Sequence, residues 1–102
     1  MLQLRPNCEC CNRALPTDSQ LALICSYECT FCRDCVERVL QNVCPNCGGG
    51  FMPRPVRPKN AYRPGVSLTQ QPASTNAVHS RYCVEEMQTF SQKLASIPPA
   101  ER

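Results

Sequence analysis

Eight cysteines in four close pairs constrain this chain more than any other feature of its sequence. The pairs are Cys8 with Cys11, Cys25 with Cys29, Cys32 with Cys35, and Cys44 with Cys47. Eight thiols are the ligand count of two tetrahedral zinc sites with four cysteines each. In a C-x2-C pair a tight turn aims both thiolates at one point, which suits a metal ion. The sequence therefore predicts two bound Zn²⁺.

The spacing of the two central pairs indicates how the sites share the chain. Only Thr30 and Phe31 separate Cys29 from Cys32. If successive pairs shared a metal, this linker would leave little room for two lobes, whereas interleaved pairs let one hairpin serve both sites. We therefore expect one zinc to be bound by Cys8, Cys11, Cys32 and Cys35, and the other by Cys25, Cys29, Cys44 and Cys47.

The full pattern, C-x2-C-x13-C-x3-C-x2-C-x2-C-x8-C-x2-C, resembles the cross-brace of RING-type zinc fingers over about residues 4 to 52. Cys29 stands where RING domains usually have a histidine. Phe31 is similar to the RING core aromatic, and Cys44-Pro45-Asn46-Cys47 to the closing C-P-x-C. The resemblance implies a small zinc-stabilised α+β fold.

A narrower resemblance adds no activity. Residues 1–11, 28–32 and 44–49 look like a family of short bacterial Cys-rich proteins classed as a domain of unknown function.

Chain length makes a covalent or metal staple necessary. The 102 residues, 10 of them proline, allow one small domain plus a tail, and a segment of some 50 residues buries too little apolar surface to fold unaided. The N-terminus resembles no signal peptide, and no run approaches the ~18 apolar residues of a membrane span. We expect a cytoplasmic protein with reduced thiols. A disulfide framework is the alternative, and iron is an alternative metal for four thiolates.

Three segments are expected. In the module, residues 1–52, the apolar run 21–25 pairs with 27–31 as a β-hairpin, and residues 35–41 form one short helix. Residues 53–76 are a flexible, basic, Pro-rich and then polar linker. Residues 77–97 form an amphipathic helix capped by Thr75 or Asn76 and stopped by Pro98. The expected core of the module is Leu21, Leu23, Phe31, Val36, Val39, Leu40 and Val43.

The C-terminal helix is expected to be a docking element separate from the module. Its apolar stripe consists of Cys83, Met87, Phe90, Leu94 and Ile97. An isolated helix of this length is only marginally stable in water. The stripe must therefore find a partner, a second copy of the chain, or the module itself.

Three further groups have weaker ligand patterns. Cys10 is spare if Cys8 pairs with Cys11, because C-x-C is a cramped arrangement. His79 and Cys83 would lie at i, i+4 on a helix and could form half a metal site, although two ligands make no site alone. For all three, packing is the simpler interpretation.

Charge is divided between the two parts of the chain. With two zinc ions and eight thiolates, residues 1–52 reach about −5, and residues 53–102 carry about +4. The chain is therefore not a uniformly basic nucleic-acid binder. Binding through the linker cations remains an alternative, and these cations are Arg54, Arg57, Lys59 and Arg63.

The sequence favours a structural zinc module that binds a macromolecule, most readily a protein, and is not an enzyme. Sites closed by four cysteines leave no position for water or substrate. The main alternative is a RING-type ubiquitin ligase. The resemblance implies an apolar docking residue after the first ligand and a cation after the last, where this chain has Glu9 and Gly48. Sensing of zinc or oxidant by the thiols is a further alternative.

Overall fold

A small antiparallel sheet forms the centre of the computed structural model, which describes residues 1–102. Its strands are β1 (Ala22–Ile24), β2 (Thr30–Cys32) and β3 (Met52–Pro53), in the order β2-β1-β3. β1 and β2 form the predicted hairpin, with Leu23 opposite Phe31. β3 was not predicted. A proline fits there because β3 is an edge strand, where one N–H can be dispensed with.

The short predicted helix is present in two parts. α1 (Arg33–Cys35) continues into η1 (Val36–Leu40), which is one wider turn of the π type. The turn ends at Gln41 and Asn42, both with positive φ, so the chain reverses toward the Cys44 turn. Val36 and Leu40 are buried on the face that the sequence predicts.

The core lies between the sheet and η1. Phe31 is fully buried and meets Phe51 edge to face, with ring centroids 5.5 Å apart. Five of the seven expected core residues are buried, whereas Val39 is partly buried against the core and Leu21 is 42% exposed. β1 begins one residue later, and Ala22 takes the buried position instead.

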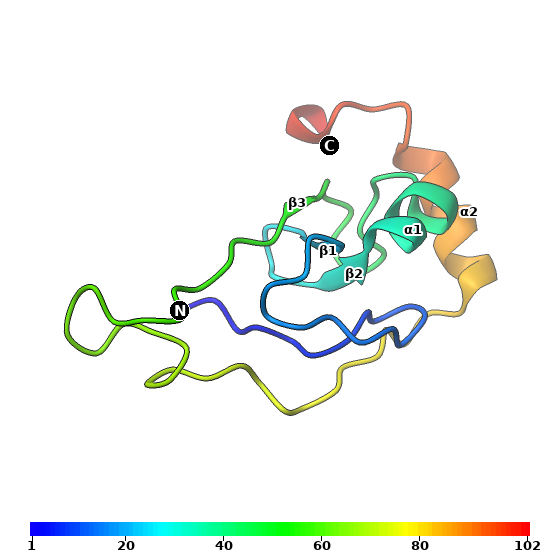
Figure 1. Cartoon of the computed structure of the whole chain (residues 1–102). Helices are drawn as coiled ribbons and strands as arrows, with labels where there is room; N and C mark the ends of the chain where they lie inside the picture. The colour runs from blue at the N-terminus through cyan, green and yellow to red at the C-terminus, as the bar shows by residue number, and fades with distance from the viewer.

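The segment between β3 and α2 lies along the module rather than extending away from it. Figure 1 shows it looping beyond the N-terminus and returning beside the N-terminal segment. The Ser74 N–H donates to the Leu4 carbonyl, and the Ser80 N–H to the Glu9 carbonyl. The expected flexible linker of residues 53–76 is thus held by contacts in this structure.

Two of the linker cations explain this placement. Arg54 is 5% exposed and donates to the carbonyls of Arg5 (2.8 Å) and Pro16 (2.9 Å). Arg57 donates to the carbonyls of Leu2 and Gln71, each at 2.6 Å. These guanidinium groups satisfy backbone acceptors of the chain itself.

The C-terminal helix is shorter than expected. α2 spans Val84–Leu94, and η2 (Pro99–Glu101) follows it. The carboxylate of Glu86 accepts the Cys83 N–H at 3.2 Å, so the helix starts there and not near Asn76. Residues 77–83 are outside the helix. No helix of the chain is both long and apolar enough to cross a membrane.

α2 packs on the module, which differs from the expectation of a separate element. Met87 is buried in the same cluster as Phe31 and Leu40. Arg102 donates to the carbonyls of Asn42 (2.8 Å) and Gly48 (3.2 Å) beyond the helix. The contacts therefore join α2 to the module, while the module's independence at residue 52 stays a prediction.

Candidate metal centre

The hairpin and the turns around it bring four thiols together at one end of β2. The sulfurs of Cys8, Cys11, Cys32 and Cys35 all lie within 4.8 Å of one another. Cys11 Sγ and Cys32 Sγ are 3.7 Å apart. A tetrahedral zinc site with Zn–S bonds of about 2.3 Å has sulfur–sulfur edges of about 3.8 Å. The first group therefore has the spacing of a tetrahedral thiolate site.

Backbone N–H groups face the sulfurs in the turns, as expected for metal-binding knuckles. The N–H groups of Cys10 and Cys11 point to Cys8 Sγ at 3.4 and 3.5 Å. Those of Tyr27 and Gly49 point to the sulfurs of Cys25 (3.3 Å) and Cys47 (3.4 Å). These dipoles stabilise negative charge on the sulfurs.

The second group is less compact. The sulfurs of Cys25, Cys44 and Cys47 lie within 4.8 Å of one another, and Cys29 is outside this set. Cys29 still neighbours Cys25, and the proximity of Cys29 contributes to the raised pKa of Cys44. The structure thus brings together three of the four thiols expected here and places the fourth beside them.

Burial makes an isolated thiolate costly in both groups. Burial raises the pKa of Cys35 and of Cys44 far above the ordinary thiol value, and neighbouring cysteines add to the effect. At Cys11, burial opposes ionisation, but the Arg13 N–H and nearby thiols bring its pKa below the ordinary value. A dication compensates this clustered negative charge.

The donor chemistry fits Zn²⁺. Every cysteine is a free thiol, and the 3.7 Å separation of the Cys11 and Cys32 sulfurs is far longer than a disulfide bond of about 2.05 Å. Four thiolates in tetrahedral arrangement are a donor set of structural zinc sites. Bound there, the metal would link the Cys8 turn to the end of β2, and the Cys25 turn to the Cys44 turn.

The three spare groups lie outside both thiol groups. Cys10 is partly buried against the core, and burial raises its pKa. His79 precedes α2 and is not on it, so the expected i, i+4 pair with Cys83 does not form. Cys83 is exposed at the start of α2, beside a surface pocket of about 620 Å³ that Cys47 also lines.

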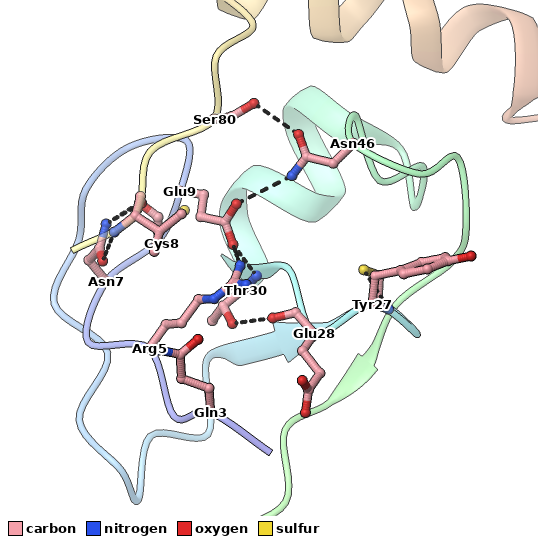
Figure 2. Close-up of polar contacts among 12 residues, drawn as sticks. Gln3, Arg5, Asn7, Cys8, Glu9, Tyr27, Glu28, Thr30, Asn46 and Ser80 are labelled. Carbon is pink, nitrogen blue, oxygen red and sulfur yellow. Dashed lines mark hydrogen bonds and ion pairs between the residues drawn. The ribbon is translucent and has the colours of Figure 1, made fainter. Parts of the chain in front are cut away.

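Glu9 has a structural role that its sequence position did not reveal. Its side chain is 2% exposed and forms an ion pair with Arg5. It also accepts the Thr30 N–H at 2.6 Å and the Asn46 side-chain N–H at 3.3 Å (Figure 2). No helix spans residues 5–9, so the i, i+4 spacing of Arg5 and Glu9 did not predict this ion pair.

Both the backbone conformation and a close neighbour disfavour a side chain at Gly48. Its φ is +82°, and a Cβ there would lie 3.2 Å from Cδ1 of Leu94. The place where RING ligases carry a cation is therefore covered by α2 in this chain.

Comparisons with known proteins give a family match and a similar protein. A profile of the family DUF1272, described as a protein of unknown function, matches residues 1–57. An uncharacterized protein of Rhizobium meliloti (strain 1021) is 55% identical over 78 residues, which cover 76% of this chain and 86% of that protein. No solved structure matches the chain.

Proposed function

This chain belongs to the DUF1272 family, and from that premise we propose that it is a structural zinc module that holds two Zn²⁺ and binds a protein partner. The observation that carries the proposal is the pair of interleaved thiol groups. One consists of Cys8, Cys11, Cys32 and Cys35, and the other of Cys25, Cys44 and Cys47. Each centre joins segments distant in the sequence, which is the role of a structural metal in a short chain.

Protein binding is favoured because the proposed centres are closed and the surface keeps apolar side chains. Tyr27, Met52 and Leu21 are large, exposed and located on or beside the strands of the sheet. Exposed apolar groups on a small rigid module are typical of a contact surface for another protein. With four thiolates on each metal, no position is left for substrate, so catalysis at the metal is not proposed. Reduced thiols require a reducing compartment such as the cytoplasm.

The two alternatives have less support. A ligase needs an exposed docking residue after the first ligand, whereas the Glu9 carboxylate is buried and fully engaged. Nucleic-acid binding through the linker needs free cations, whereas two of the four, Arg54 and Arg57, bind carbonyls of the chain. A ubiquitin-discharge assay and the salt dependence of nucleic-acid binding separate these activities from the proposal.

Metal content and metal removal test the proposal directly. We expect two zinc ions per chain, and we expect a strong chelator to abolish cooperative unfolding, because each structural site contributes ~10–16 kcal/mol of apparent binding free energy. Elemental analysis and thermal unfolding by circular dichroism measure these outcomes. One zinc per chain, or a chelated chain that still unfolds cooperatively, refutes the two-centre module.

Paired substitutions test the interleaving. Cys8→Ala and Cys32→Ala should remove the same centre, and Cys29→Ala and Cys44→Ala the other. Loss of one centre by Cys8→Ala and of the other by Cys32→Ala would establish a serial arrangement instead.

A further inference from the structure

The Glu9 carboxylate links segments that carry ligands of different thiol groups. The backbone of Glu9 lies in the turn between Cys8 and Cys11, which belong to the first group. Its carboxylate accepts from Thr30, the residue after Cys29, and from Asn46, which lies between Cys44 and Cys47. Figure 2 shows the carboxylate between these donors. The side chain thus reaches from the first group to the second.

The partners of Glu9 also surround Cys29. Arg5, Glu9, Cys29 and Asn46 line one surface pocket. Arg5, held by Glu9, faces the same thiol. The Nε of Arg5 is buried without a partner. Donors on this side of Cys29 are therefore oriented by Glu9.

We propose that Glu9 is a positioning residue of the second metal centre, which orients Cys29 as its fourth ligand through Thr30, Arg5 and Asn46. The inference rests on the proposed function, since it presupposes metal in both centres. Cys29 lies outside the tight set of Cys25, Cys44 and Cys47, so its approach to a metal depends on its surroundings more than theirs does. Groups that hydrogen-bond to metal ligands typically change metal affinity 10–100-fold.

Substitution of Glu9 should weaken the second centre, whereas its position in the sequence alone would predict weakening of the first. Glu9 lies between two ligands of the first centre, so a local disturbance of its turn would weaken that centre. Positioning through the carboxylate weakens the second centre instead. Glu9→Gln keeps the size of the side chain and removes the charge that holds Arg5.

Cadmium-113 NMR of the full chain separates the two centres, because each bound ion gives its own resonance, assigned through couplings to its cysteine protons. Chelator is added stepwise to the loaded wild type and to Glu9→Gln. We expect the second-centre resonance of Glu9→Gln to disappear at about 10–100-fold lower chelator concentration, and the first-centre resonance to be unchanged.

Two further variants make the test specific. Cys10→Ser is the matched control in the same turn, because its thiol faces Cys35 of the first group, and it should leave the second centre unchanged. Asn46→Ala should reproduce the second-centre loss. The double variant Glu9→Gln/Asn46→Ala should lose less than the sum of the two single losses, since Asn46 is one of the three groups through which Glu9 acts. Asn46 is exposed, so this variant carries the test if Glu9→Gln does not fold.

The possible results are distinct. Equal weakening of both centres, selective weakening of the first, or no change in either overturns the positioning role of Glu9. A wild-type chain that fails to bind two metal ions refutes the proposed function itself.

Discussion

Gly48 shows how a single residue can be fixed by two independent constraints. Its positive φ disfavours any side chain, and a Cβ there would lie 3.2 Å from Leu94 Cδ1 and 3.7 Å from Phe90 Cζ, both of α2. Gly65 has almost the same φ, +81°, but nothing lies within 4 Å of its Cβ position. The two glycines therefore separate backbone strain from packing.

Substitution of each glycine by alanine measures the free-energy costs of backbone strain and of packing. Gly65→Ala should lower the free energy of unfolding by about 1–2 kcal/mol, the cost of a left-handed residue with a side chain. Gly48→Ala should lose that amount and about 1–3 kcal/mol more from overpacking against α2. Denaturant unfolding of the metal-loaded chains provides both values. Equal losses would mean that α2 does not cover Gly48 in solution.

At the same scale, the sequence predicted much of the candidate site but not its polar surroundings. The spacing of cysteines is a local signal, and the structure brings together all four thiols expected in the first group and three of the four expected in the second, with Cys29 outside it. The contact of Glu9 with Asn46 joins residues 37 positions apart, and no spacing in the sequence encodes it. Glu9 was instead compared with an exposed docking residue, whereas it is buried.

Among the elements, the segment after β3 depends on its arginines. Arg54 donates to carbonyls of the N-terminal segment and of the loop before β1, so it fastens β3 to both. Burial lowers its pKa, yet the hydrogen bonds to backbone oxygens retain the charge inside. A run of prolines and cations predicted a solvated linker because composition does not reveal these acceptors.

Arg54→Ala should destabilise the metal-loaded chain by about 2–4 kcal/mol, since buried carbonyls lose charged donors. Arg63→Ala is the matched control, because Arg63 is exposed in the same segment, and it should change the free energy of unfolding by less than about 0.5 kcal/mol. Thermal and denaturant unfolding compare the two. A similar small effect of both substitutions would favour the interpretation of this segment as a solvated linker.

Element boundaries were predicted less well than element types. The hairpin and the first helix follow from short apolar runs, whereas β3 has only two residues and no pattern to detect. The C-terminal stripe was found, but residues 77–83 of the predicted helix lie outside α2, because the Glu86 carboxylate sets the start of the helix at Cys83. Side-chain capping decided the boundary.

At the scale of the whole molecule, α2 contributes to the stability of the module. Met87 is 3% exposed and belongs to the core, so α2 adds to a core that the thiol groups already surround. We therefore expect removal of the helix to weaken the fold, while every candidate ligand remains in the chain.

A chain truncated after Pro55 should retain two metal ions and unfold at lower denaturant than the full chain. The loss should at least equal that of Met87→Ala in the full chain, about 2–5 kcal/mol. Metal analysis and denaturant unfolding of both variants provide the comparison. Fewer than two metals on the truncated chain would move the boundary of the module from residue 52 to the end of α2.

The interleaved order of the thiols also determines which group is completed first as the chain is synthesised. The first group is complete once Cys35 has emerged from the ribosome, whereas the second must wait for Cys47. At about 5–20 residues per second, the interval is on the order of one second. During it, the four thiols of the first group are already present in the nascent chain, while Cys25 and Cys29 are still without Cys44 and Cys47.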